Sequence, residues 1–453
     1  MSWSSSPRFT RPFRRGRDRH GRVEPQFGDS QPPIAPAAES AAVPRVTLPR
    51  RYFLSATGGG IAAVIAARPA SVAALSPHHD ATGSPQPASG VRISCHGDHQ
   101  AGIVTPAPTH LLLAGFDLTV THRRDVVELL RTWQSAIERL TAGSSLGDGS
   151  SLSSPPVDTG EALGQGPARL TLTIGFGPSL FDARFGLAER RPAALVDLPA
   201  FAGEALDPAV GGGDLSVQAC ADRQVVVEHA LRDLARQGAG AVRVRWTRSG
   251  FNEAPVLPSG GTPRNLLGFK DGTANLDAGD ADRMRRNVWV ARTDGPNWMV
   301  GGTYQVYRRV ALRIEDWDAS ILDEQQDTFG RYKVSGAPYG GHDEFDPVNV
   351  AMQPTDSHIR LANPRTGQAS EDERILRRGY NFSDGVDPAT GKQQAGLAFI
   401  AYQRDPRRQF VTIQQRLAAN DALNEYAIHT ASGIFAVPPG VRGTDFVGSR
   451  LFA

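Results

Sequence analysis

The sequence of 453 residues contains little cysteine and no long hydrophobic run. Its two cysteines, Cys95 and Cys220, are too few for a disulfide framework, and neither stands in a C-x-x-C spacing, so a zinc or iron–sulfur site is disfavoured. The two could pair after export, but a small buried thiol is the favoured state of each. The most apolar run near the start, residues 58–67, is too short for a permanent membrane-spanning helix.

The chain also lacks a large excess of one charge. The formal net charge is +2, but residues 1–74 hold eleven arginines against four acids, which leaves 38 basic and 43 acidic groups in the remainder. This mildly acidic body makes a surface for nucleic acid unexpected. With 40% hydrophobic and 21% charged residues, the composition is that of a globular protein of two or three domains.

The first 90 residues are rich in Arg, Pro, Ser and Ala without periodicity, so we expect a disordered or removed leader. Within them, PRRYFL at 49–54 precedes a weakly apolar Gly/Ala segment and a run of small residues. This order is typical of a twin-arginine export signal, with its motif at 50–54 and cleavage near 73–76. A basic tail with a chance arginine pair is the alternative. Export of a folded protein suits one that acquires a cofactor in the cell and acts in the periplasm or outside.

Hydrophobic periodicity predicts two successive α+β units, residues 91–255 and 256–453. The first is predicted to contain a strand from Leu111, a helix from Arg123, a surface loop at 143–168, a strand near 169–177, a helix at 225–237 and a strand near 241–251. The second is predicted to contain a strand from Thr303, a helix from Trp317, a strand from Gly396, helical sequence over 410–429 and a short coda. We therefore expect two antiparallel sheets with helices.

Four segments of the second unit carry candidate chemistry: GFKDGTAN at 268–275, FGRYKVSGAP at 329–338, DSHIRLANPRT at 356–366 and RILRRGYNF at 374–382. Singly, an Asp-Gly turn, a lone histidine and paired arginines all have ordinary structural explanations. Arg360 and Arg365 follow His358, and we expect their positive field to lower the pKa of the imidazole and favour its neutral, metal-ligating form. The same arginines suit anionic carboxylates, as a haem site requires, although spacing alone ranks a structural histidine higher.

In combination, GFKDGTAN, DSHIRLANPRT and ILRRGY resemble the dye-decolorizing (DyP-type) haem peroxidases. CHGDHQAGIVTP at 95–106, DLSVQACAD at 214–222, NLLGFKDG at 265–272 and FGRYKVSGAP agree with this resemblance. It extends over residues 93–440 and is strongest to the exported branch that includes the periplasmic deferrochelatase/peroxidase of iron-uptake operons. The resemblance implies two ferredoxin-like domains, with one haem b per chain bound in the C-terminal domain.

By position in the family's motifs, the resemblance implies that Asp271 is the distal acid–base residue, that Arg377 stabilises the bound peroxide and that His358 is the axial iron ligand. A register slip of one residue would put Arg378 in place of Arg377. The resemblance implies further haem contacts from Gly272, Thr273, Ala274, Arg331, Asn363, Pro364 and Arg365. Because aspartic acid ionises at lower pH than histidine, an aspartate base predicts an acidic activity optimum.

Other assignments are less specific. Glu425 is the candidate acid behind His358 by family position, and Phe399 either covers the distal face or belongs to the core. Family members can pass electrons from bulky donors through aromatic side chains, and the candidates here are Tyr304, Tyr332, Tyr380, Trp289 and Trp298.

The leading hypothesis is therefore a haem b peroxidase that reduces hydrogen peroxide and oxidises aromatic or dye-like donors. Alternatives are a deferrochelatase or a ferrous-iron oxidase in iron uptake, and, from another class, a non-catalytic haem carrier or sensor. Asp271 and Arg377 together favour an enzyme, because a carrier needs no proton shuttle. Without the resemblance, the sequence can be interpreted as an exported α+β binding protein without a cofactor. The twin-arginine translocase is a transient partner, and a homodimer remains open.

Overall fold

A computed structural model of the chain describes residues 90–147, 152–253 and 261–453. The predicted export motif at 50–54, the cleavage region at 73–76 and the domain boundary at residue 255 lie outside the described residues and stay predictions. The elements below account for the remainder of the chain.

The first half has the element order βαββαβ. Its elements are β1 (His110–Leu118), α1 (Arg123–Thr141), β2 (Thr171–Phe176), β3 (Leu215–Ala221), α2 (Gln224–Gln237) and β4 (Val242–Phe251). The strands lie in the order β4-β1-β3-β2, and every neighbouring pair is antiparallel. This is the ferredoxin-like arrangement.

The second half repeats this plan with insertions around the helices. Its strands are β5 (Thr303–Leu312), β6 (Leu376–Arg377), β7 (Tyr380–Val386), β8 (Gln393–Gln403) and β9 (Ala427–Val437). Its helices are α3 (Ala281–Asn287), α4 (Ile314–Ala319), α5 (Leu322–Phe329), α6 (His358–Ala362), α7 (Gln368–Asp372), α8 (Phe410–Asn420) and α9 (Ser449–Phe452). The order β9-β5-β8-β7 is again ferredoxin-like, and short β6 adds to β8.

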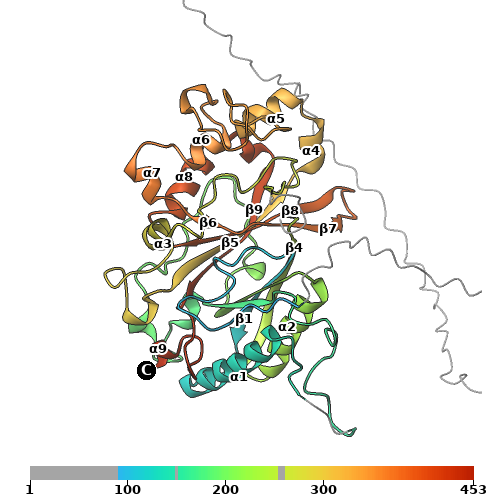
Figure 1. Ribbon diagram of the computed structural model, residues 1–453, viewed down its shortest axis with the longest axis vertical. Coiled ribbons are helices and arrows are strands. Elements are labelled where there is room, and N and C mark those ends of the chain that lie inside the picture. Colours follow the sequence, from blue (N-terminus) through green and yellow to red (C-terminus); the bar gives the residue numbers. More distant parts are fainter. Residues whose placement is uncertain (1–89, 148–151, 254–260) are drawn as a thin grey trace, which may run out of the picture. The chain divides into compact units, whose positions relative to one another are not determined.

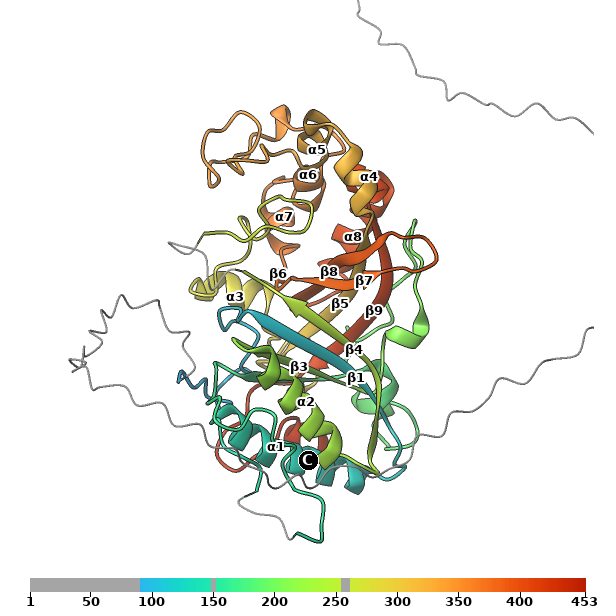
Figure 2. The same ribbon diagram turned by 90° about the vertical axis from the view of Figure 1, so that its right-hand side faces the viewer.

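The two sheets join at both edges into a closed ring. One joint pairs Phe176 of β2 with Ala436 of β9, and the other pairs Phe251 of β4 with Asn381 of β7. Figures 1 and 2 show α1 and α2 at one end of this strand layer, and α4, α5, α6, α7 and α8 at the opposite end. The second group of helices is therefore the one that can enclose a site against β5, β8 and β9.

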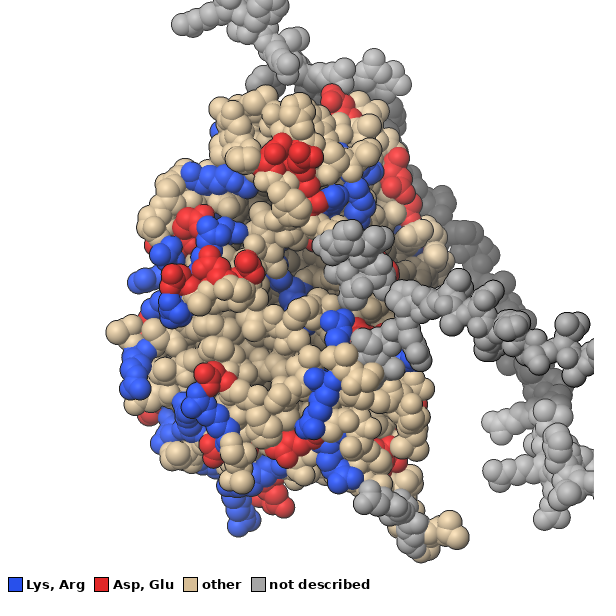
Figure 3. Space-filling view, viewed as in Figure 1, with Lys and Arg blue, Asp and Glu red and all other residues tan. Residues whose placement is uncertain are grey.

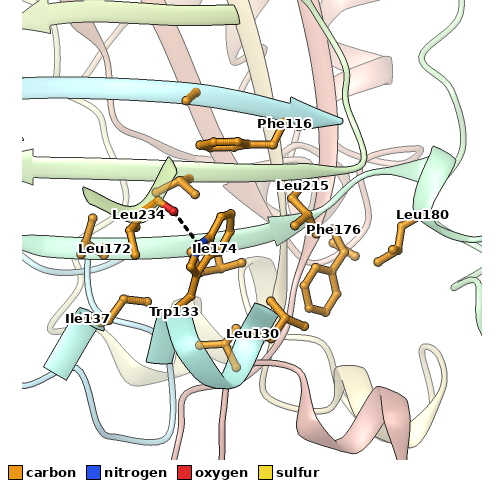
Figure 4. Close-up of a cluster of buried hydrophobic side chains, with 14 of the residues drawn as sticks. Phe116, Leu130, Trp133, Ile137, Leu172, Ile174, Phe176, Leu180, Leu215 and Leu234 are labelled. Atoms are coloured by element: carbon orange, nitrogen blue, oxygen red, sulfur yellow. Dashed lines mark hydrogen bonds between the residues drawn. The ribbon is translucent and has the colours of Figure 1, made fainter. Parts of the chain in front are cut away.

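Helix α1 forms because its apolar residues recur every three or four positions and so share one face. Figure 4 shows Leu130, Trp133 and Ile137 of this face packed against strand residues of the first half. The indole nitrogen of Trp133 donates a hydrogen bond of 2.9 Å to the carbonyl of Leu234 in α2. This bond satisfies the polar atom of a fully buried ring and ties the two helices together.

Strand β1 is buried on both faces, so its alternate side chains enter two different cores. Leu112, Ala114 and Phe116 pack with α1 and α2, whereas Leu111 and Leu113 belong to a cluster inside the ring. That inner cluster contains side chains of both halves, including Trp246, Tyr307, Tyr380, Tyr402 and Phe435. The centre of the ring is therefore filled by side chains.

The fold class expected from the sequence is confirmed, but strands β3 and β7 were missed and the last part of the chain was assigned wrongly. Strand β3 was not predicted, because LSVQACA is short and buried on both faces and so shows no polar alternation. The helical prediction over 410–429 was too long, since α8 ends at Asn420. The first five residues of the supposed coda GIFAVPPG are the end of β9, an eleven-residue strand of mostly small side chains.

Several smaller predictions concern surfaces and thiols. The described residues of 143–168 contain no α-helix or strand. Cys95 is partly exposed and Cys220 buried, and both are free thiols. No helix in the described ranges is long and apolar enough to cross a membrane. On the face drawn in Figure 3, basic and acidic side chains are interspersed.

Candidate active site

The segment that carries Asp271 is a tight turn anchored by apolar packing. The side chain of Asn265 accepts hydrogen bonds from the backbone nitrogens of Leu267 and Phe269, and the Asp271 nitrogen donates to the Pro263 carbonyl. Phe269 is 1% exposed and stacks on Phe329, with ring centroids 4.2 Å apart. The burial of Phe269, two residues earlier, and the bond to Pro263 anchor the backbone from which the carboxylate of Asp271 projects.

His358 is the first residue of α6, and the segment that leads into it packs closely on Gly330 at the end of α5. Helix α5 ends at Phe329 and is capped by Gly330, whose φ of 76° is left-handed and where a Cβ would clash with the side chain of Gln353. The Nδ1 atom of His358 lies 2.7 Å from Oδ2 of Asp421, and the Asp421 side chain is 3% exposed. This bond fixes the imidazole and directs Nε2 to the cavity that His358 lines.

Two predictions about His358 were wrong. Its acidic partner is Asp421 and not Glu425, which is exposed four residues further along. Its pKa is raised rather than lowered: burial lowers it, but the carboxylate of Asp421 outweighs burial. Arg360 does not act as expected because its guanidinium is turned to the carbonyls of Val350 and Gln353.

Asp271 and Arg377 meet although 106 positions separate them. Nη1 of Arg377 donates to Oδ1 of Asp271 at 2.8 Å. Their side chains keep 25% and 32% exposure, and both line the same cavity as His358. Arg378 is turned away: it is 7% exposed and donates to the Thr105 carbonyl. The register of the arginine pair thus places Arg377 beside the aspartate.

Asn275 fixes the backbone of Arg377 from both sides. Its Oδ1 accepts from the Arg377 nitrogen at 2.9 Å, and its Nδ2 donates to the Arg377 carbonyl at 2.8 Å. Because Asn275 lies four residues after Asp271, the turn that carries the aspartate also holds the strand that carries the arginine. This clamp was not found from the sequence, although the asparagine stands in the quoted motif.

One cavity joins the predicted residues. It is lined by Asp271, Gly272, Thr273, Ala274, Arg331, His358, Asn363, Arg365 and Arg377, whereas Pro364 is not among its lining residues. Phe399 lines it as well, so this ring is not plain core. Sequence reasoning missed the wall formed by α8 and β9, which contributes Ile413, Gln414, Leu417 and His429.

The cavity fits a flat, dianionic macrocycle. Arg331 is 6% exposed and Arg365 lies close to it, yet both donate to backbone carbonyls, and within the described ranges neither forms an ion pair with a carboxylate. Burial, Arg331 and Arg374 lower the pKa of Arg365 to about 10. Guanidinium groups that are buried or partly buried without a carboxylate partner are costly, and two propionates would neutralise them. Leu312, Ile413 and Leu417 supply apolar walls.

The five aromatic candidates for electron transfer differ in exposure. Trp289, Trp298, Tyr304 and Tyr380 are buried, whereas Tyr332 is 41% exposed. Tyr332 is therefore the candidate that an external donor can touch.

Comparisons with known proteins agree with this geometry. Family models described as Dyp-type peroxidase, N-terminal and Dyp-type peroxidase, C-terminal match residues 100–252 and 262–442. A deferrochelatase of Escherichia coli O6:K15:H31 (strain 536 / UPEC) is 42% identical over 367 residues, which cover 79% of this chain and 86% of the relative.

Solved structures of Dyp-type proteins are similar to this chain as well. DtpA from Streptomyces lividans is similar with a TM-score of 0.75 at 37% identity, over 81% of this chain and 98% of that one. A DyP-type peroxidase from Streptomyces coelicolor has a TM-score of 0.75 at 38% identity, over 82% and 99%. The chain belongs to the Dyp-type peroxidases. As a member of this family it is a haem-dependent enzyme, with haem b as its cofactor.

Proposed function

We propose that the chain reduces hydrogen peroxide and oxidises aromatic or dye-type donors, with His358 as the iron ligand and Asp271 and Arg377 acting on peroxide. The observation that carries this proposal is the 2.8 Å pair of Asp271 and Arg377 in the same cavity as a histidine whose Nδ1 is committed to Asp421. When bound, haem b supplies the iron at which peroxide accepts two electrons.

The cofactor would be held by groups of both helices and turns. His358 offers Nε2, and Arg331 and Arg365 offer guanidinium groups to the propionates. Gly272 has a φ of 133°, and a Cβ there would contact the side chain of Thr262. A glycine at this point leaves the backbone free to approach the macrocycle.

Reduction of peroxide requires a proton to move from one of its oxygens to the other before the O–O bond breaks. A carboxylate oxygen of Asp271 can accept the first proton and return it to the departing oxygen, which leaves as water. The Arg377 guanidinium can hold the oxygen on which negative charge develops. Two further protons and two electrons from donor molecules complete the reduction to two waters.

A second cavity supports a route for peroxide to this pair. It shares Asn265, Asp271, Gly272, Arg377, Leu397 and Phe399 with the first cavity, and its other lining residues include Thr105, Arg264 and Asn381. The two cavities meet at Asp271 and Arg377. A small molecule that enters through the second cavity therefore reaches these side chains before it reaches His358 in the first.

The test measures peroxide-dependent oxidation of an anthraquinone dye by haem-loaded protein. Asp271→Asn and Arg377→Leu should each lower kcat/KM for peroxide by about 10²- to 10⁴-fold, as removal of an acid–base or electrostatic group does. Asp277→Asn, an exposed aspartate of the same segment, should leave it unchanged. His358→Ala should remove the Soret band. Full turnover by both site variants would falsify the proposed mechanism.

A second candidate activity, removal of iron from haem with two protons taking its place, is favoured by the 42% identity to a deferrochelatase. It is tested by incubating the protein with excess haem and an iron chelator and following porphyrin fluorescence. Porphyrin release without peroxide supports this activity, and unchanged haem excludes it. Peroxide-dependent oxidation of ferrous iron in the same preparation would support the third candidate, a ferrous-iron oxidase.

We also propose that the chain leaves the cytoplasm by the twin-arginine route and acts in the periplasm or outside the cell. The support is the motif at 50–54 and the small residues at 70–74. Replacing Arg50 and Arg51 together by lysine should retain the protein in the cytoplasm, as cell fractionation would show. Unchanged export of this variant would contradict the assignment.

A further inference from the structure

A group of buried, titratable side chains lies in the first half, among residues that do not line the haem cavity. The segment 152–168 runs against α2, and there Asp158 meets His229 and Asp233 of that helix. These three residues are 9%, 6% and 0% exposed. Nε2 of His229 lies 2.9 Å from Oδ1 of Asp158 and 3.0 Å from Oδ2 of Asp233. All three candidate ligand atoms lie within 4.8 Å of one another.

The backbone holds both carboxylates in place. Asp158 accepts from the nitrogens of Leu146 at 2.9 Å and Gly160 at 2.7 Å, and Asp233 accepts at Oδ1 from the Thr159 nitrogen at 3.1 Å. His229 and Asp233 are four residues apart in a helix and so project from one face. One oxygen of each carboxylate is thereby turned towards the same imidazole nitrogen.

A single proton on that nitrogen cannot satisfy both oxygens. The N–H is aligned with Asp158, so Oδ2 of the fully buried Asp233 has only the ion-pair contact of 3.0 Å with a nitrogen that Asp158 also uses. A buried carboxylate oxygen that must share its one partner is poorly compensated. Its only close neighbour of opposite charge, among the described residues, is His229 itself.

The charges do not balance either. Two carboxylates and one imidazolium carry a net negative charge in a site that water barely reaches, and no lysine or arginine in the described part of the chain forms an ion pair with Asp158 or Asp233. The neighbouring Glu161 adds a further carboxylate, which is paired with Arg232. A divalent cation, with a neutral imidazole and two carboxylates, would make the site neutral.

The distances suit such an ion. Ligands held about 2.1 Å from a transition metal lie about 3 Å apart when they are neighbours in its coordination shell. Mixed imidazole and carboxylate ligands favour Zn²⁺, Mn²⁺ and related ions over Ca²⁺, which prefers a shell of oxygens.

We propose that Asp158, His229 and Asp233 bind a divalent transition-metal ion of the Mn²⁺ or Zn²⁺ type, which fastens the segment 152–168 to α2. The ion is structural. It bridges a loop and a helix that are also joined by the ion pair of Glu161 with Arg232 and by bonds from Arg236 and Gln237 to the carbonyls of Pro156 and Val157.

Haem-loaded protein freed of metal with EDTA is titrated with MnCl₂ or ZnCl₂ by calorimetry, with CaCl₂ as the comparison. We expect one saturable site per chain for Mn²⁺ or Zn²⁺, much weaker binding of Ca²⁺, and a higher Tm with the ion present. The double variant Asp158→Asn/Asp233→Asn should lose this site and the shift in Tm. Asp197→Asn, an exposed aspartate of the same half, should retain both.

Limited proteolysis gives a second readout that is independent of activity. Cleavage within 152–168 should accelerate when EDTA removes the ion and slow again when Mn²⁺ or Zn²⁺ is returned. His229→Gln offers a milder variant should the double variant not fold, and it should weaken binding at least 10-fold. Absence of a saturable site in the natural chain, or equal binding by the variants, would overturn the proposal.

Discussion

Asp421 and His358 lie 63 positions apart, yet the carboxylate of one holds the imidazole of the other at 2.7 Å. Asp421 directly follows α8, and its Oδ1 accepts from the Leu423 nitrogen of the turn that comes next, so the chain reversal after α8 sets the orientation of the carboxylate. The position of the proposed iron ligand therefore depends on where α8 stops.

Replacing Asp421 by asparagine should weaken haem binding or turnover by about 10- to 100-fold, because the imidazole loses an anionic partner that orients it and raises its basicity. Haem retention is measured by transfer to an apo acceptor, and the reduction potential of bound haem should rise. Glu425→Gln is the matched control, because Glu425 is exposed and should affect neither quantity. Equal effects of the two variants would contradict the assignment.

The sequence could predict the parts of the site that occupy characteristic motifs. Asp271, His358 and Arg377 each stand in a segment of distinctive residues. The buried face of α1 could be predicted as well, because its apolar residues recur at a regular helical period. Asp421 could not be predicted in this way. It stands in LAANDALNE, where an aspartate at a helix end is an ordinary capping residue, and only the packing of α8 on α6 brings it to His358.

The same limit applies to strands. β3 and β9 are buried along most of their length and contain small or polar residues, so their periodicity carries little information. Their place follows from pairing with β1 and β5, which are far away in sequence. The fold class could therefore be predicted from the stronger elements, whereas the cavity wall that β9 contributes could not.

Asn275 should be a positioning residue for Arg377. Asn275→Ala removes both hydrogen bonds to the arginine backbone, and a shift of about 1 Å in a group that acts on substrate can cost about 100-fold in rate. We expect kcat/KM for peroxide to fall by about 10- to 100-fold while the Soret band stays.

If Asn275 were only a structural residue, its replacement by alanine would lower stability and leave the turnover of folded protein unchanged. Asn420→Ala, at the exposed end of α8, provides the control for truncation of an asparagine. The denaturation midpoints of both variants should be measured together with their kinetics. Loss of stability without loss of kcat/KM in Asn275→Ala would contradict a positioning role for Asn275.

His429 should make the folded protein sensitive to acid. Burial and the guanidinium of Arg308, whose Nε donates to Nδ1 at 3.2 Å, lower the pKa of His429 to about 3. In the unfolded chain the pKa is about 6.5. Between these values the unfolded state binds the additional proton, so the free energy of unfolding decreases as the pH falls below about 6.5.

The measurement compares the natural chain with His429→Gln by denaturant unfolding of haem-loaded protein at pH 7 and pH 4.5. Other groups titrate equally in both proteins, so their contributions cancel. At one pKa unit per 1.36 kcal/mol, the natural chain should lose about 2.5 kcal/mol more than the variant on acidification. An identical loss in the two proteins would mean that His429 is already protonated in the folded state, and that the buried Arg308 beside it does not exclude the second positive charge.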